Sequence, residues 1–151
     1  MGKTVFTGES YSYIFDGAGG MRDQLEQTIL SEMDEKGYPL KRTIKDIKAG
    51  GMFFGTKEQC VVIEIDKESQ IVISNTTVGK YLYVEVYLMI QEKSVLFSAF
   101  SAMVDNIFKE QKRTAVFFAA REITECAFLK LGLKQSNSGY KGTAKSINSE
   151  D

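Results

Sequence analysis

The sequence predicts an α+β domain in which helices pack on one face of an antiparallel sheet. Three β-branched and aromatic runs follow one another between short polar turns in residues 59–90, which is typical of a β-meander. A helical pattern precedes these runs in residues 21–36, and apolar helical patterns follow them in residues 94–133. We therefore expect an N-terminal helix, about four to five strands and C-terminal helices, arranged as two layers.

The N-terminal part of the chain predicts strands followed by a helix. Residues 4–15 contain two short runs with strand character, and residues 21–36 repeat apolar side chains at helical spacing. Gly37, followed by Tyr38 and Pro39, supplies a stop for this helix. The apolar stripe consists of Met21, Leu25, Ile29 and Met33. Charged residues off the stripe are expected to face water: Arg22, Asp23, Glu26, Glu32 and Glu35.

The segment 39–49 fits two structures. Leu40, Ile44 and Ile47 would share one face of a short helix that has proline at its first position. The β-branched side chains of Thr43 and Ile44 also allow an edge strand. We favour the helix, because the odd separation of Ile44 and Ile47 fits strand alternation less well.

The clearest strand signals are residues 59–66, 70–75 and 80–90, with 52–55 as a further strand. In an extended chain successive side chains point to opposite faces. The even-numbered side chains of 80–90 are then expected in the core: Leu82, Val84, Val86, Leu88 and Ile90. The odd-numbered ones lie on the other face: Tyr81, Tyr83, Glu85, Tyr87 and Met89.

The odd-numbered face of residues 80–90 is the first candidate binding surface, at Tyr81, Tyr83, Glu85 and Tyr87, and alternation in residues 60–66 adds Glu64 to the same side. Tyrosines can stack on bases, but single-strand nucleic-acid sites also carry Lys and Arg along the backbone. Because this face carries carboxylates instead, we expect a protein or small-molecule partner and no nucleic acid. The alternative is that the tyrosines pack beneath a helix or lie on a half-wet face without a partner.

The stretch DGAGG joins the first strand region to the first helix and is the second candidate site. Backbone N–H groups converge where a glycine-rich turn enters a helix, so such a turn can hold a phosphate. The candidate anion-binding residues are Gly17, Gly19, Gly20 and Arg22. The stretch lacks the third glycine of the dinucleotide fingerprint and the Gly-Lys-Ser/Thr ending of a P-loop. We therefore favour a turn that lets the chain enter the helix.

The composition excludes several kinds of catalytic site. The chain has no histidine, which removes Ser-His-Asp and Cys-His arrangements, and two cysteines cannot form a four-thiolate zinc site. We assign no catalytic residue, metal or cofactor. The alternative function is a histidine-free enzyme that uses Glu64 or Glu85 as general base and the glycine stretch to hold an anionic substrate.

The C-terminal third predicts two helices, over residues 94–111 and 114–133, with Thr114 as a candidate cap. The second helix has an apolar stripe and a solvent-side pair formed by Arg121 and Glu125. The stripe consists of Val116, Ala120, Ile123, Ala127 and Leu131, widened by Phe117 and Phe128. The apolar content exceeds what one narrow stripe requires, so either both helices are central to the core or a surplus face forms a homodimer. Residues 134–151 are expected to be a flexible polar tail after a single domain of residues 1–133.

Charge and cysteine content indicate the cellular compartment of the protein and the classes of partner that it does not attract. A formal net charge of −1 gives no overall attraction to phosphate backbones or anionic lipid. Two cysteines are too few for a secreted disulfide framework, and no apolar run approaches the roughly 20 residues that span a bilayer. We expect a small cytoplasmic binding or regulatory module without membrane insertion, acting through a sheet face or a helix surface.

Overall fold

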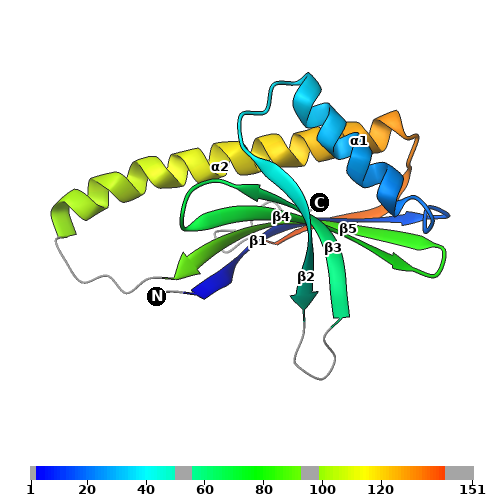
Figure 1. The fold of residues 1–151 in the computed structure, drawn as a ribbon, viewed down its shortest axis with the longest axis horizontal. Helices are drawn as coiled ribbons and strands as arrows, with labels where there is room; N and C mark the ends of the chain where they lie inside the picture. Colours follow the sequence, from blue (N-terminus) through cyan, green and yellow to red (C-terminus); the bar gives the residue numbers. More distant parts are fainter. Residues whose placement is uncertain (1–2, 50–55, 93–98, 142–151) are drawn as a thin grey trace.

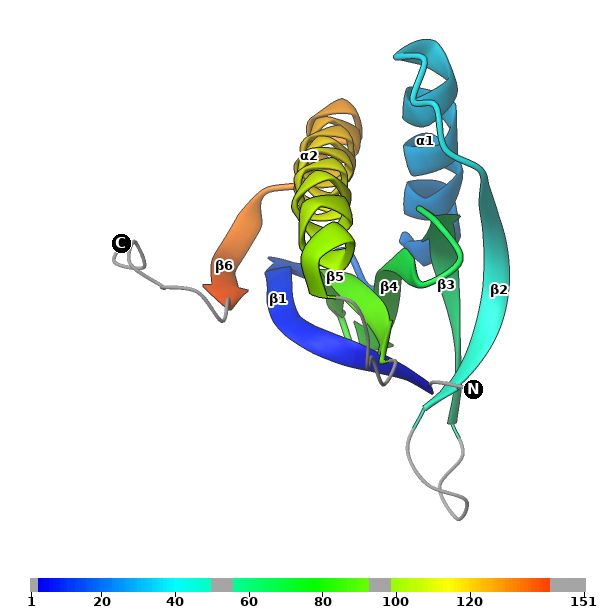
Figure 2. The same ribbon diagram turned by 90° about the vertical axis from the view of Figure 1, so that its left-hand side faces the viewer.

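The computed structural model describes residues 3–49, 56–92 and 99–141 of the chain. These residues form a six-stranded antiparallel sheet with the strand order β2-β3-β4-β5-β1-β6, and α1 and α2 lie on one face of it (Figures 1 and 2). The expected two-layer α+β arrangement is confirmed. The elements are β1 (Lys3–Asp16), α1 (Arg22–Glu35), β2 (Arg42–Ala49), β3 (Thr56–Glu64), β4 (Ser69–Val78), β5 (Tyr81–Glu92), α2 (Ala99–Lys130) and β6 (Gln135–Lys141).

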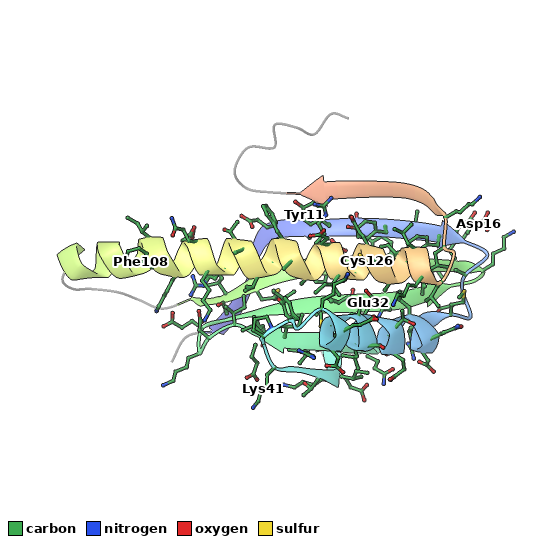
Figure 3. The ribbon with its side chains drawn as sticks, turned by 90° about the horizontal axis from the view of Figure 1, so that it is seen from above. Tyr11, Asp16, Glu32, Lys41, Phe108 and Cys126 are labelled. Atoms are coloured by element: carbon green, nitrogen blue, oxygen red, sulfur yellow. The ribbon has the colours of Figure 1, made fainter. Side chains whose placement is uncertain are left out.

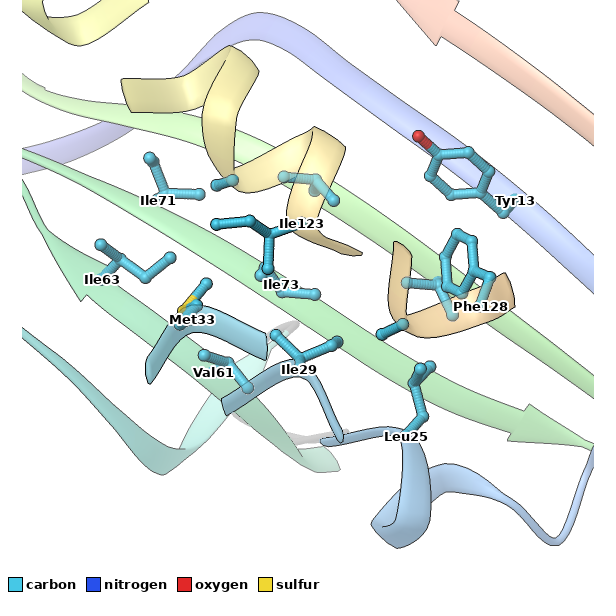
Figure 4. Close-up of a cluster of buried hydrophobic side chains, with 14 of the residues drawn as sticks. Tyr13, Leu25, Ile29, Met33, Val61, Ile63, Ile71, Ile73, Ile123 and Phe128 are labelled. Atoms are coloured by element: carbon cyan, nitrogen blue, oxygen red, sulfur yellow. The ribbon is translucent and has the colours of Figure 1, made fainter. Parts of the chain in front are cut away.

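The core lies between the two helices and the face of the sheet that they cover (Figure 4). Alternation along β5 confirms the prediction for its even-numbered side chains from Leu82 to Leu88, which are buried. Ile90, also expected in the core, is half-buried. The apolar stripe of α1 and the stripe of α2 pack against the buried side chains of β5, because each element has one apolar face to remove from water. Buried members of the cluster include Leu25, Ile29, Met33, Val61, Ile63, Ile71, Ile73, Phe117, Ala120, Ile123 and Phe128.

Both helices end at a glycine. Gly37 has a φ of +67°, and the Tyr38 N–H beyond it donates to the Met33 carbonyl at 2.9 Å. This six-to-one bond defines a Schellman motif, which glycine accommodates without a Cβ penalty. The same arrangement ends α2 at Gly132, with a φ of +70°. The stop predicted at Gly37 is confirmed.

The C-terminal helical region is one helix of 32 residues, so the predicted break before Thr114 is wrong. Residues 99–130 contain no glycine or proline, and Thr114 lies inside the helix. Arg113, which lies between the two predicted helices, instead contacts the sheet side of the molecule. Arg113 is buried, and its Nε donates to Ser69 Oγ at 3.0 Å beside the carboxylate of Asp66. This contact joins α2 to the β3–β4 turn.

The helix favoured for residues 39–49 is also wrong, because β2 occupies Arg42–Ala49. β2 pairs with β3 along its whole length. These backbone hydrogen bonds stabilise the extended segment, whereas a helix of this length is only marginally stable on its own.

At the N-terminus, the two short strands expected in residues 4–15 are one strand, β1, with a register shift between Phe6 and Ser10.

The polar segment expected as a flexible tail is in part a strand. Gln135–Lys141 forms β6 and pairs with β1 at the edge of the sheet. Its serines, asparagine and glycine carry no apolar pattern, so the pairing depends on backbone hydrogen bonds that the sequence does not display. Residues 142–151 lie outside the described residues, as does the strand expected at 52–55.

Two carboxylates of α1 that were expected to face water are buried. Glu32 is 2% exposed and forms ion pairs with Lys130 of α2 and Lys36, and the hydrogen bond with Lys130 lowers its pKa. Glu26 is 1% exposed and accepts a hydrogen bond from Asn75 Nδ2 of β4 at 3.0 Å. Burial raises the pKa of Glu26, because a carboxylate loses its hydration there.

We predict that Glu26 makes the protein less stable as pH rises. Folded Glu26 holds its proton above pH 4.5, where the unfolded side chain releases it, so stability falls from that pH until the folded pKa is passed. Urea denaturation across this pH range should give a smaller fall for Glu26→Gln than for the wild type, because the amide cannot titrate. An unchanged slope in Glu26→Gln would contradict the prediction.

Candidate functional site

The candidate binding surface lies on the sheet face opposite the helices, around Glu85 in the middle of β5. Ser12 of β1 and Ser74 of β4 are the cross-strand neighbours of Glu85, so their side chains share its face. The Glu85 carboxylate accepts hydrogen bonds from Ser10 Oγ to Oε2 and from Tyr83 OH to Oε1, both at 2.9 Å. Hydroxyl donors from two strands therefore fix both carboxylate oxygens.

Further hydroxyl groups extend this network. Ser12 hydrogen-bonds to Tyr83, while Ser74 and Glu85 hydrogen-bond to Tyr87. We call the set the Glu85 cluster, which consists of Ser10, Ser12, Ser74, Tyr83, Glu85 and Tyr87. Burial raises the pKa of Tyr87 to about 12, and burial also raises the pKa of Tyr83. Both phenols keep their protons near neutral pH, so they act as hydrogen-bond donors and not as bases.

A small apolar patch borders the Glu85 cluster. Cys60 and Val62 of β3 and Val72 of β4 are buried, and Tyr87 and Met89 of β5 pack against them. Tyr87 belongs to both groups, so the Glu85 cluster lies beside this buried patch, of which Tyr87 and Met89 remain half-buried. Within the described ranges, no helix covers this face of the sheet (Figures 1 and 2).

Tyr81 and Glu64 lie on the same face but outside the cluster. Tyr81 pairs with Asp16 at the beginning of β5 and is 38% exposed. Glu64 pairs with Gln70 and is exposed, two strands and four positions away from Glu85. Strands about 4.8 Å apart with a rise of about 3.3 Å per residue place the two carboxylates roughly 16 Å apart. At this separation Glu64 and Glu85 do not form an acid/base pair.

The glycine stretch docks on the β4–β5 turn. Gly17 has a φ of +80° and turns the chain out of β1. The Gly19 N–H donates to the Lys80 carbonyl at 3.0 Å, and Thr77 Oγ1 donates to the Gly19 carbonyl at 2.9 Å. A Cβ on Gly19 would lie 2.4 Å from the Gly79 carbonyl oxygen. Close approach of two backbones therefore accounts for glycine at position 19.

Gly20 and Arg22, which follow Gly19 in the candidate anion-binding stretch, have different surroundings from Gly19. A Cβ on Gly20 would meet no atom within 4 Å, and Arg22 Nε pairs with the Asp23 carboxylate at 3.7 Å. The stretch follows the pairing of Asp16 with the first residue of β5, which places it about 13 Å along the strand from Glu85. Anion binding by this stretch stays a prediction, and the two candidate sites are separate.

We predict that Gly19→Ala destabilises the protein and Gly20→Ala does not. The new methyl group at position 19 would have to displace the carbonyl of Gly79, and overpacking of this kind costs about 1–3 kcal/mol. The methyl group at position 20 enters open space, so its effect should stay within about 0.5 kcal/mol. Urea denaturation of both variants at one pH measures the difference, and equal midpoints would contradict the packing role of Gly19.

Contacts with α2 hold β1 in place on the helix side of the sheet (Figure 3). Tyr13 OH donates to Glu125 Oε2 at 2.6 Å, and Arg121 Nε donates to the same oxygen at 3.1 Å. The guanidinium carbon of Arg121 lies 4.3 Å from the centre of the Tyr11 ring. Arg121 and Glu125 form the predicted ion pair, but the pair lies against the aromatic face of β1 and not on the solvent side.

Sequence reasoning missed the three serines of the cluster. The alternation from Ser10 to Phe15 was a signal that could have placed Ser10 and Ser12 on one face. Their contact with Glu85 depends on the pairing of β1 with β5, which no local pattern specifies. Ser74 likewise reaches the cluster through the register of β4 with β5.

Comparison with known proteins assigns no family to the chain. No protein-family profile and no curated protein matches it. A solved structure with partial similarity is the exocytosis-sensitive phosphoprotein pp63/parafusin, a phosphoglucomutase from Paramecium in its open form, at 9% identity and a TM-score of 0.44. The similarity covers 85% of this chain and 22% of that chain.

The described residues contain no group of three or more Cys, Asp or Glu side chains that could hold a metal ion. In the same part of the chain, no helix is both long enough and apolar enough to cross a bilayer. Cys60 and Cys126 are free thiols.

Proposed function

We propose that the protein is a small binding module that acts through the Glu85 cluster and the half-buried side chain of Met89 beside it. The observation that carries the proposal is the Glu85 carboxylate, which Ser10 and Tyr83 hold in one orientation on an open sheet face. A side chain held by neighbouring hydroxyls is preorganised for a partner, because less conformational entropy is lost on binding. The free thiols of Cys60 and Cys126 support a cytoplasmic setting.

The chemistry of the surface indicates the groups that a partner would present. An ionised carboxylate accepts hydrogen bonds and donates none, so Glu85 favours an amine, guanidinium or amide N–H. The faces of the Tyr83 and Tyr87 rings attract cations, and the half-buried Tyr87 and Met89 side chains add apolar surface. We therefore propose a protein side chain or small ligand that combines a cationic donor with an apolar group. This combination disfavours the anionic backbone of nucleic acid.

The alternative of a histidine-free enzyme has less support. It requires the glycine stretch and a strand carboxylate to converge, and the two lie on different parts of the sheet. The Tyr83 and Tyr87 hydroxyls beside Glu85 keep their protons near neutral pH, since burial raises the pKa of each. No observation favours this alternative over the binding module.

We predict saturable binding of phenethylammonium, which carries one aromatic ring and one ammonium group, at the Glu85 cluster. Backbone amide shifts of residues 83–87 in two-dimensional NMR should titrate with millimolar phenethylammonium and not with 3-phenylpropionate, its anionic counterpart. Glu85→Gln should weaken binding about tenfold or more, because a charge-assisted hydrogen bond is worth about 1.5–3 kcal/mol.

The matched control is Glu64→Gln, which removes a carboxylate from the same sheet face outside the cluster. It should bind phenethylammonium as the wild type does. Binding that survives Glu85→Gln, or amide shifts that do not saturate, would refute the proposed site.

A further inference from the structure

The outward face of α2 carries large apolar side chains that remain exposed in the described part of the chain. Ile107, Phe118 and Leu129 are 56%, 49% and 77% exposed. They follow one another at intervals of 11 residues, which is three helical turns, so they form one stripe along the helix. Their span corresponds to about 33 Å of helix. Neighbouring members of the stripe lie about 16 Å apart, with polar residues between them, so a partner that covers all three must be elongated.

The spacing of the stripe is symmetric about Phe118. When two copies of a helix pack antiparallel about a two-fold axis, each residue faces the residue at the same distance on the other side of the axis. With the axis at Phe118, the two Phe118 side chains meet each other. Ile107 of each copy then faces Leu129 of the other at both ends of the contact. Each of the three exposed apolar side chains is thus covered by an apolar side chain of the other copy.

The polar residues between these positions are compatible with the same pairing. Glu122 would face Thr114, and Glu125 would face Gln111, so each carboxylate meets a side chain that can donate a hydrogen bond. No pair in this register places like charges opposite each other. Antiparallel pairing in one register also avoids the repulsion between parallel helix dipoles.

The position of α1 leaves room for the second copy. α1 runs beside the C-terminal half of α2, and the half that carries Phe108 extends past it (Figure 3). A two-fold axis at Phe118 brings the α1-flanked half of each α2 over the open half of the other. Phe108, which is 64% exposed, lies on that open half.

We propose that the protein forms a two-fold homodimer in which the two α2 helices pack antiparallel about Phe118, with Ile107 of each copy against Leu129 of the other. This interface lies on the opposite side of the molecule from the Glu85 cluster, so the dimer does not depend on ligand binding there. A crossing angle near 20° keeps the helices in contact over the required length.

Sedimentation velocity and light scattering at micromolar to submillimolar concentration test the proposal on the full chain. The wild type should have about twice the 16.9 kDa mass of the chain. Phe118→Glu should be monomeric, or weaken the dimer about tenfold or more, while its circular dichroism and thermal unfolding show a folded protein. Val78→Glu, at an exposed apolar site of β4 remote from α2, is the matched control and should remain dimeric.

A mixing experiment tests the register itself. Ile107→Lys and Leu129→Glu should each weaken the dimer, because each would face an apolar residue. An equal mixture of the two variants should recover heterodimers, because one of the two contacts then pairs Lys with Glu across the axis. A wild type that stays monomeric would overturn the proposal, as would a dimer that Phe118→Glu leaves intact. A mixture that associates no better than the separate variants would overturn the register.

Discussion

The pairing of β5 with β4 on one side and β1 on the other sets both surfaces of the sheet. The even-numbered side chains of β5 lie under the helices, where full burial of each aliphatic side chain contributes about 1.5–3 kcal/mol. Three odd-numbered side chains of the same strand, Tyr83, Glu85 and Tyr87, belong to the Glu85 cluster. A slip of one residue would move each set to the wrong face. The energetics of the core therefore keep the candidate site in register, although no residue of the site contributes to that core.

Strand β1 makes contacts on both faces of the sheet. Its aromatic side chains face α2, where Tyr13 donates to Glu125 and Arg121 lies over Tyr11. Its serines face the opposite way and fix the Glu85 carboxylate. β1 thus contributes aromatic side chains to the contact with α2 and serines to the Glu85 cluster, because alternate residues of a strand point to opposite faces.

Sequence patterns predicted those features that repeat within one element, and they did not predict contacts between elements. Alternation in residues 80–90 and helical spacing in residues 21–36 are local, so the dry face of β5 and the stripe of α1 could be predicted. Burial of Glu26 depends on Asn75, which lies 49 residues away. Burial of Arg113 likewise depends on Ser69 and Asp66 at the distant β3–β4 turn, which no local pattern displays. Strand β6 could not be predicted either, because it has no apolar pattern and forms through backbone pairing with β1.

The long separation between β1 and its partners has a consequence for synthesis. β1 is made first, yet its neighbours in the sheet are β5 and β6, which are translated much later. Until β5 leaves the ribosome, the aromatic face of β1 has no sheet to join, and unpaired strands of this kind are prone to aggregate. Topologies with such distant pairings also fold slowly. The nascent chain would accordingly need shielding by chaperones for longer than a domain whose first strand pairs with its second.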